Sequence, residues 1–258
     1  TDKPNIPNSF TVQVPASSSN CGPGFDALSV ALTLYNFVRL VPSDGARISW
    51  CGEAPLHGQT LAMVEETASA FFKAAQLPER GFAFDIWGDV PVTRGLGSSA
   101  TIRTGMLAAL NAWQGAPLDR RTLVRLGTTL DQAADGISAC FYGGFCVSRV
   151  DPQTGQYRDT LRFDVPDHLA FVVVSPEIPV HTPMARSILP TEVPFQEAVH
   201  TLNSLAWLVS VFASGQHEQL RGAVTDYIHQ PYRMKLTPFV EEAIAAGRAA
   251  GAYDGWLS

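Results

Sequence analysis

The sequence predicts a two-domain protein that mixes strands and helices, and three observations carry this prediction. The chain has 258 residues, which suits one large domain or two smaller ones. Hydrophobic residues make up 46% and charged residues 16% of it, as in ordinary globular enzymes and unlike disordered chains. Segments with an apolar residue at every second position are interspersed with segments that have helical spacing. We expect the first domain over residues 1–155 and the second over residues 156–258.

The first half of the chain alternates between strand-like and helix-like segments. Alternating apolar residues predict a strand from Phe10 to Val14, which Pro15 ends ahead of a Ser- and Gly-rich loop that runs to Asp26. Residues 64–76 place apolar side chains on one side of a helix, and residues 82–86 return to the spacing of a strand. A glycine-rich motif follows this second strand.

An Ala-rich helix that ends near Trp113 comes after the glycine-rich motif. A second helix is expected over residues 120–134, and a strand over residues 145–150. The polar stretch 151–159 is typical of a hairpin or a linker. We therefore place the domain boundary there.

The second domain is predicted to be mainly helical. A β-rich run over residues 169–175 favours an interior strand of a second sheet, and residues 195–213 have the apolar spacing of a helix. In a last helix, Thr237 suits the N-cap, Pro238 the first helical position and Gly251 the left-handed stop.

Charge and composition exclude several classes of partner. The formal net charge is -6 and no Lys or Arg residues form a run, which argues against a nucleic-acid surface. No apolar stretch approaches the roughly twenty residues that span a bilayer, so we expect no membrane partner. The cysteines form no CxxC pair and have no His at zinc-ligand spacing, so reduced thiols and a cytoplasmic location are expected. They are Cys21, Cys51, Cys140 and Cys146.

The strongest local signal is the glycine- and serine-rich motif between a predicted strand and a predicted helix. Backbone amides at a helix N-terminus are free to meet anions, and glycines permit close approach. The serine hydroxyls can cap the helix, bind phosphate or ligate magnesium. No Lys follows the glycines as in a Walker loop, and a tight turn with a serine cap is an equal alternative. The motif consists of Arg94, Gly95, Leu96, Gly97, Ser98, Ser99 and Ala100.

A second cluster lies in the loop over residues 15–26, which combines an amide and a carboxylate with several Gly and Pro residues. Such a loop can hold a polar metabolite through Asn20 and Asp26. The alternative is a turn in which both side chains bond only to their own backbone.

These two motifs, in this order, resemble the first and second motifs of the GHMP small-molecule kinases. The stretches HTPMARSILP (181–190) and DYIHQPYR (226–233) resemble the branch that acts on homoserine rather than the mevalonate or galactose branches. The likeness spans nearly the whole chain. Residues 251–258 resemble the start of the third motif, which in the family continues with more Gly and Ser, so we expect the chain to be cut inside it.

The resemblance implies an α+β fold: an N-terminal domain with a left-handed β-α-β unit, a ferredoxin-like C-terminal domain, and an active site between them. It implies ATP and Mg²⁺ as cofactors, with residues 94–100 around the ATP phosphates. A hydroxyl of Ser98 or Ser99 would share the metal with Asp131, which stands where the family usually has the longer Glu. The family often forms dimers, so a homodimer is an expectation as well.

For the acceptor, the resemblance points to homoserine, a zwitterion. Arg186 and Arg233 would clamp its carboxylate while Asp26 and Asn20 receive its ammonium group. The alternative for each arginine, taken alone, is a surface or interdomain ion pair. The alternative for His229 is that it holds the turn of Arg233.

Phosphoryl transfer needs positioning and charge neutralisation more than covalent chemistry. If a catalytic base exists, Asp135 is the candidate, with Asp26 as the other catalytic acid. The family's His-Pro-Asp-Asn motif reads Ala133-Ala134-Asp135-Gly136 here, so His and Asn are missing. Three hypotheses follow: a kinase that makes O-phosphohomoserine on the route to threonine, a GHMP kinase for another small hydroxylated acid, and a non-catalytic ligand sensor.

Overall fold

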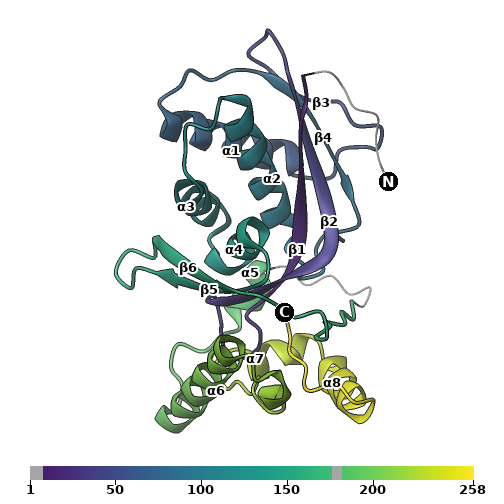
Figure 1. Ribbon diagram of the computed structural model, residues 1–258, viewed down its shortest axis with the longest axis vertical. Coiled ribbons are helices and arrows are strands. Elements are labelled where there is room, and N and C mark those ends of the chain that lie inside the picture. The colour runs from purple at the N-terminus through teal and green to yellow at the C-terminus, as the bar shows by residue number, and fades with distance from the viewer. Residues whose placement is uncertain (1–7, 176–181) are drawn as a thin grey trace.

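The computed structural model describes residues 8–175 and 182–258, and strands drawn from residues 10–163 form a six-stranded sheet. Figure 1 shows α1 to α4 on one side of β1 and β2, with α6, α7 and α8 beneath the sheet. The strands are β1 (Phe10–Ser19), β2 (Leu28–Pro42), β3 (Ile48–Trp50), β4 (Phe82–Gly88), β5 (Phe145–Val150) and β6 (Tyr157–Phe163). The helices are α1 (Thr60–Ala75), α2 (Ser98–Trp113), α3 (Arg120–Asp131), α4 (Ala134–Tyr142), α5 (Thr182–Ser187), α6 (Phe195–Ser214), α7 (Gln230–Arg233) and α8 (Phe239–Ala249), with short 3-10 turns at His217–Leu220 and Met234–Leu236.

The long strand β2 organises the sheet, whose order is β3-β4-β2-β5-β6 with β1 also paired to β2. β2 is antiparallel to β1, β4 and β5. The prediction that β1 ends at Pro15 is wrong, because the strand continues to Ser19 after a register shift between Pro15 and Ser17. A proline lacks the ladder N–H and is tolerated at such an irregularity, so the strand reaches the loop that carries Asn20.

β3 and β4 are parallel neighbours joined through α1, which makes a β-α-β unit. Its left-handed sense stays a prediction. The ferredoxin-like topology of the second domain also stays a prediction, since the described residues after Phe163 form helices. No helix in residues 8–175 and 182–258 is long and apolar enough to cross a membrane.

Two expected elements differ from the structure. The helix predicted over residues 120–134 ends at Asp131, because Gln132 adopts a left-handed φ of +57°, and a separate helix α4 follows. The strand predicted over residues 169–175 is wrong, since no strand is assigned among these described residues. Phe171 instead packs its ring against Trp256 at 5.8 Å.

The β5–β6 hairpin extends the sheet across the boundary expected near residue 155. The division into domains over residues 1–155 and 156–258 therefore stays a prediction. The other expected elements are confirmed: the strand over residues 145–150, the helix after the glycine-rich motif and the helix α6. In the last helix, Pro238 rather than Thr237 takes the N-cap position, and Thr237 donates its hydroxyl hydrogen to the carbonyl of Arg233.

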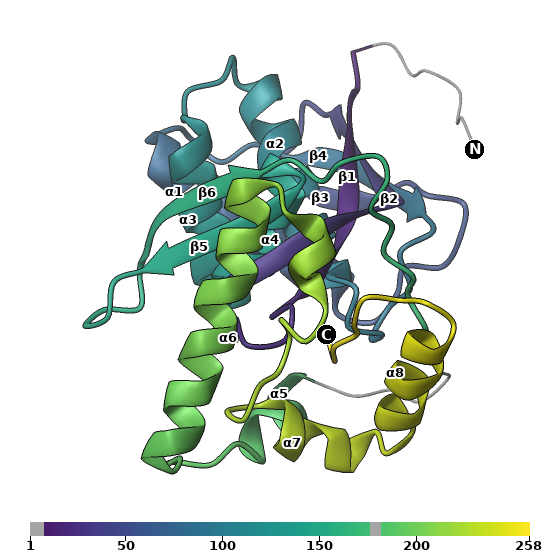
Figure 2. The ribbon, with the colours of Figure 1, turned by 60° about the horizontal axis from the view of Figure 1, so that its bottom comes forward.

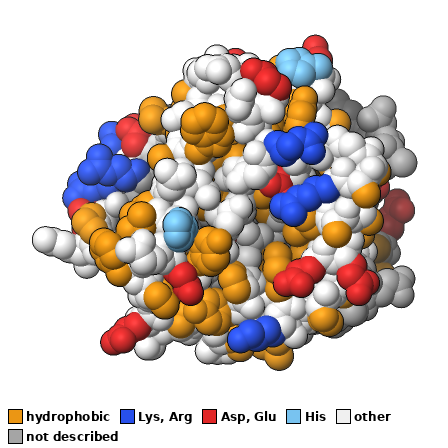
Figure 3. Space-filling view, turned by 90° about the horizontal axis from the view of Figure 1, so that it is seen from below, with side chains coloured by type: hydrophobic (Ala, Val, Ile, Leu, Met, Phe, Trp, Pro, Cys, Tyr) orange, Lys and Arg blue, Asp and Glu red, His pale blue; other side chains and the backbone are white. Residues whose placement is uncertain are grey.

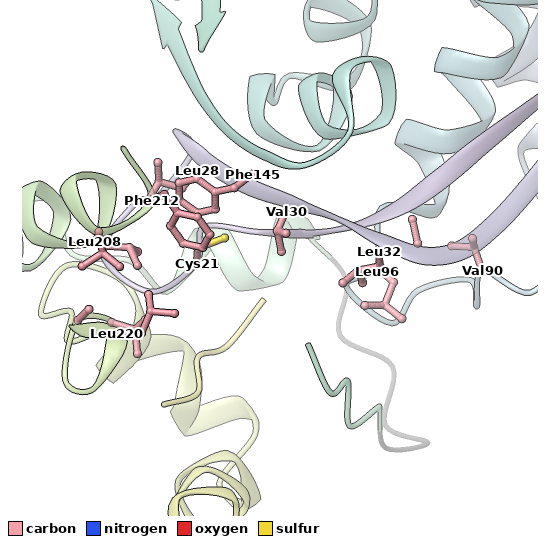
Figure 4. Close-up of a cluster of buried hydrophobic side chains, with 14 residues drawn as sticks. Cys21, Leu28, Val30, Leu32, Val90, Leu96, Phe145, Leu208, Phe212 and Leu220 are labelled. Carbon is pink, nitrogen blue, oxygen red and sulfur yellow. The ribbon is translucent and has the colours of Figure 1, made fainter. Parts of the chain in front are cut away.

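One hydrophobic cluster joins the sheet to the C-terminal half of the chain (Figure 4). Phe145 of β5 stacks on Phe212 of α6, with ring centroids 3.9 Å apart and an interplanar angle of 6°. Leu96 of the glycine-rich motif is 3% exposed and belongs to the same cluster. Stacked aromatic pairs add to the free energy of burial. The glycine-rich motif and α6 therefore pack into the same hydrophobic cluster. Figure 2 shows the C-terminal end of the chain lying between α6 and α8.

Candidate active site

The glycine-rich motif opens helix α2 beside the end of β1. The backbone N–H of Ser17 donates to the carbonyl of Leu96 at 3.2 Å, which fixes the motif to the sheet. The Ser258 hydroxyl donates to the carbonyl of Gly95 at 2.9 Å, so the end of the described chain also meets the motif. Residues from both halves of the sequence therefore meet at the N-terminus of α2. Seen from below, the molecule carries Lys or Arg side chains next to acidic ones (Figure 3).

Both glycines of the motif have a left-handed φ of +71°. A Cβ on Gly97 would lie 2.4 Å from the Ser17 Oγ, whereas one on Gly95 would meet nothing closer than 3.6 Å. Within the described part of the chain, no side chain caps α2. The alternative interpretation of the motif, a tight turn with a serine cap, therefore does not hold. The amides of the first turn of α2 are left to face an anion, as the phosphate-cradle prediction requires.

Replacing Gly97 by alanine is expected to destabilise the fold and to weaken ATP binding, because it adds backbone strain and a clash with Ser17. Gly115 is a matched control: its φ is +80°, but a Cβ there meets nothing within 4 Å. The strain alone costs about 1–2 kcal/mol in the free energy of unfolding. Urea unfolding and the KM for ATP should therefore show a larger loss for G97A than for G115A. Equal losses would contradict the close packing on Ser17.

Asp131, at the end of α3, lies close to the motif. Burial raises the pKa of its carboxyl group, and a hydrogen bond from Ser99 and the charge of Arg103 only partly oppose this. The Arg103 Nε lies 3.5 Å from the Asp131 Oδ1, and the same guanidinium donates to the Glu66 carboxylate at 2.8 Å. Asp131 therefore lies near the hydroxyl with which it was predicted to share a metal, and its direct ligation of that metal stays a prediction.

This pair fits a magnesium ion in its donor chemistry, since Mg²⁺ prefers hydroxyl and carboxylate oxygens. No group of three or more His, Cys, Asp and Glu side chains in the described residues could hold a metal. Magnesium typically takes one or two protein oxygens and completes its shell with phosphate and water. Ser99 and Asp131 therefore suit a metal that arrives with a nucleotide.

Asp26 and Arg186 form a bidentate ion pair at the predicted acceptor site. The Arg186 Nη2 donates to the Asp26 Oδ1 at 2.7 Å and the Nη1 to the Oδ2 at 2.9 Å, while both side chains stay about 40% exposed. The guanidinium also lies 5.4 Å from the ring centre of Phe25. An ion pair was the alternative interpretation for Arg186, and the structure has one. Its partner, however, is Asp26, which is itself a residue of the predicted site.

Asn20 shapes the loop that carries Asp26. Its Oδ1 accepts from the backbone N–H of Asp26 at 3.1 Å, and the two residues have left-handed φ values of +68° and +56°. For Asn20 this is the expected alternative of a turn that bonds to its own backbone. A contact of Asn20 with an ammonium group stays a prediction.

Asp135 lies in the first turn of α4, 3% exposed. Burial, and next the negative charge of Asp26, raise its pKa to about 6, although hydrogen bonds from the Gly136 N–H and the Ser19 hydroxyl oppose the rise. The Ser29 hydroxyl donates to the Asp135 carbonyl at 2.7 Å. A buried carboxyl group with a pKa near neutrality suits proton transfer.

Arg233 ends the short helix α7 and faces the same cluster. Burial, and next the charge of Arg186, lower the pKa of its guanidinium, while Asp26 and Asp135 raise it. Its Nη1 lies 3.4 Å from the Nδ1 of His229, and its Nη2 donates to the Ser258 carbonyl at 3.4 Å. The structure thus pairs Asp26 with Arg186, and Asp135 and Arg233 lie within electrostatic reach of this pair. Asn20 supports the loop of Asp26. His181, the first residue of the Arg186 stretch, lies outside the described residues.

Sequence reasoning missed Ser19 and Arg103. Ser99 and Arg103 are four positions apart on α2, so they share a helix face, and this spacing could have indicated that both reach one acid. Ser19 gave no such signal, because it lies in a run of three serines and only the strand that carries it sets its direction.

Residues 62–144 match the family model for the GHMP kinases N terminal domain. The homoserine kinase of Caldanaerobacter subterraneus subsp. tengcongensis is 38% identical over 251 residues, which cover 96% of this chain and 79% of the relative. The chain therefore belongs to the GHMP kinases, and so it is an ATP-dependent small-molecule kinase. A second relative named homoserine kinase, from Carboxydothermus hydrogenoformans, is 35% identical over 257 residues, covering 96% of this chain and 81% of that protein.

Solved structures show the same α+β fold. The homoserine kinase of Cytophaga hutchinsonii superposes with a TM-score of 0.83 at 25% identity, covering 100% of this chain and 84% of that one. The phosphomevalonate kinase of Streptococcus pneumoniae shares the fold alone, with a TM-score of 0.66 at 14% identity over 93% of this chain and 85% of that one. The predicted family and fold class are confirmed.

Proposed function

We propose that this protein transfers the γ-phosphate of ATP to the side-chain hydroxyl of L-homoserine, producing O-phospho-L-homoserine for threonine biosynthesis. One observation supports this acceptor above the others. The Asp26–Arg186 ion pair feels the charges of Asp135 and Arg233, and Arg233 is linked through Ser258 to the glycine-rich motif that suits ATP phosphates. A zwitterion with a hydroxyl between its charges and the phosphate is complementary to that arrangement.

The acceptor would be held by its two charges. Arg186 and Arg233 offer planar forks of donors that match a carboxylate, and Asp26 offers acceptors for an ammonium group. In the structure, Arg186 and Asp26 satisfy each other. Their ion pair holds both side chains in the orientation that the acceptor needs. A bound zwitterion would place its carboxylate against Arg186 and its ammonium group against Asp26.

Asp135 would accept the proton of the acceptor hydroxyl. Its pKa of about 6 leaves it ionised at neutral pH but basic enough to take a proton during transfer. Ser19 and the Gly136 N–H would hold the carboxylate in place meanwhile.

We also propose how the metal and the nucleotide are held. Ser99 and Asp131 hold the Mg²⁺ that accompanies ATP, and the ion supplies neutralisation of the phosphate charge. Residues 94–100 surround the phosphates. A homodimer and a cytoplasmic location also belong to the proposal.

A different small hydroxylated acid is the second candidate, and Gly136 favours it. A Cβ at this position would lie 3.5 Å from the Ala100 Cβ and 3.6 Å from the hydroxyl oxygens of Ser17 and Ser19, so the glycine leaves space for about one methyl group beside the candidate base. An acceptor that differs from homoserine by such a small group could use that space.

A coupled assay of ADP release separates these functions. ADP release that depends on L-homoserine, and is absent with other hydroxy amino acids and with mevalonate, is the expected result. Release with another acceptor only would reject homoserine in favour of the second candidate. Tight nucleotide binding without any release would identify a ligand sensor on a kinase fold.

A further inference from the structure

His229 lies between the loop of Asn20 and the guanidinium of Arg233. Its side chain is fully buried, at 0% exposure, just before α7. The Nε2 lies 2.7 Å from the carbonyl oxygen of Gly22, a residue 207 positions earlier in the chain. The Nδ1 lies 3.4 Å from the Arg233 Nη1. The imidazole ring therefore contacts both the loop that carries Asp26 and the guanidinium of Arg233.

The two partners require one tautomer of this ring. A carbonyl oxygen only accepts a hydrogen bond, so the Nε2 must carry the proton. A guanidinium only donates, so the Nδ1 must present its lone pair to Arg233. The neutral imidazole with hydrogen on Nε2 satisfies both contacts at once. A protonated ring would direct an N–H and a positive charge at Arg233.

The charged groups around the ring come from three elements. Asp226 precedes α7, with its Oδ2 3.5 Å from the Nε2, and accepts from the backbone N–H groups of residues 228–230. Arg233 faces the Nδ1, and Asp26 acts from the loop. Burial lowers the pKa of His229, and so does Arg233, against the opposing effects of Asp226, Gly22 and Asp26. The balance favours the neutral ring.

The loop also packs directly on the imidazole. The ring of Phe25 lies 5.0 Å from the ring of His229, and Phe25 is in turn the ring over which Arg186 lies. His229 therefore connects to Arg233 by one nitrogen, to the loop by the other, and to Arg186 through Phe25.

We propose that His229 is a positioning residue of the acceptor site, whose neutral imidazole holds the Arg233 guanidinium in register with the loop that carries Asp26. The inference rests on the proposed function, because it gives Arg233 the acceptor carboxylate. It predicts that His229 acts on acceptor binding through Arg233.

Two conservative substitutions separate the two contacts. The amide of glutamine can occupy the Nε2 position and keep the donor to Gly22, whereas that of asparagine occupies the Nδ1 position and keeps an acceptor for Arg233. H229Q should raise the KM for homoserine about tenfold or more, since a hydrogen bond to a charged group is lost, and leave the KM for ATP within about twofold. H229N should raise the KM for homoserine less than H229Q.

A double-mutant cycle tests whether the effect passes through Arg233. H229Q should change kcat/KM for homoserine by less than about twofold when R233A is already present, because no guanidinium remains to be oriented. A role in general stability would give the same fold-change in both backgrounds, and that result would overturn the proposal. H217Q is the matched control, since His217 is also buried but its ring contacts Phe212 and His168. It should leave the KM for homoserine unchanged.

A direct measurement on the ring keeps this inference separate from the proposed function. Nitrogen-15 NMR of the whole protein should show His229 neutral at pH 7 with its hydrogen on Nε2. An imidazolium, or hydrogen on Nδ1, would overturn the positioning role even if homoserine is phosphorylated. Absence of homoserine turnover in the unmodified protein would reject the proposed function, while the tautomer would still decide the arrangement of His229.

Discussion

R233A is expected to raise the KM for homoserine about 100-fold, with the KM for ATP changed by less than about twofold, because losing one partner of a buried, hydrogen-bonded charge pair costs about 2–5 kcal/mol. The guanidinium is half-buried, feels the charges of Arg186, Asp26 and Asp135, and reaches the glycine-rich motif only indirectly, through the Ser258 carbonyl. Steady-state kinetics with each substrate varied in turn gives both KM values.

Two further variants sharpen that measurement. R233K keeps the charge but loses the planar fork, so its KM for homoserine should fall between those of the unmodified protein and R233A. R80A is the control, because Arg80 is exposed and lies over the ring of Trp113 at the end of α2. An unchanged KM for homoserine in R233A would remove Arg233 from the acceptor site.

D135N is expected to lower kcat by about 10²–10⁴-fold, the usual contribution of a positioned general base. Because the pKa of Asp135 is about 6, kcat/KM of the unmodified protein should fall as pH drops through about 6. The residual activity of D135N should lack that acid limb. A D135N protein with full kcat would show that no base is needed at this position.

The same substitution should stabilise the fold at neutral pH. The folded pKa of Asp135 is raised from 3.8 to about 6, so the folded state binds more protons between these values. Its contribution to stability is fully present below about pH 4 and is lost as pH rises through about 6. The ionised carboxylate therefore costs about 3 kcal/mol above pH 6, and D135N should recover about 1–3 kcal/mol in the free energy of unfolding at pH 7.5. D164N, at an exposed aspartate, is the control and should change the free energy of unfolding little.

Local patterns predicted most of the regular elements around the site. The strand over residues 145–150 and the helix that follows the glycine-rich motif agree with the structure because their spacing and flanking residues point the same way. The break between α3 and α4 could not be predicted. It depends on the left-handed backbone of Gln132, a conformation that sequence favours strongly only at glycine.

That break also separates the two nearby acids for which different roles are proposed. Asp131, before the break, lies near Ser99 of the phosphate motif. Asp135, after it, faces Asp26 and Ser19 in the acceptor cluster. The predicted helix over residues 120–134 included Asp131 but not Asp135, and it gave no sign that Asp135 lies in the first turn of a separate helix.

The acceptor cluster itself depends on contacts between distant parts of the chain. Arg186 meets Asp26 across 160 positions, and His229 meets Gly22 across 207. No local spacing encodes such contacts, and only the resemblance to a family suggested that the arginines converge. The role of Asn20 shows the limit of that inference, since its side chain serves the loop backbone.

Identification of the product tests the central claim most directly. The protein is incubated with ATP, Mg²⁺ and L-homoserine, and phosphorus-31 NMR together with mass spectrometry follows the transferred phosphate. The account predicts one O-phospho-L-homoserine for each ADP formed, and no ADP without homoserine. ADP that accumulates at the same rate without homoserine, with the phosphate recovered as inorganic phosphate, would contradict it.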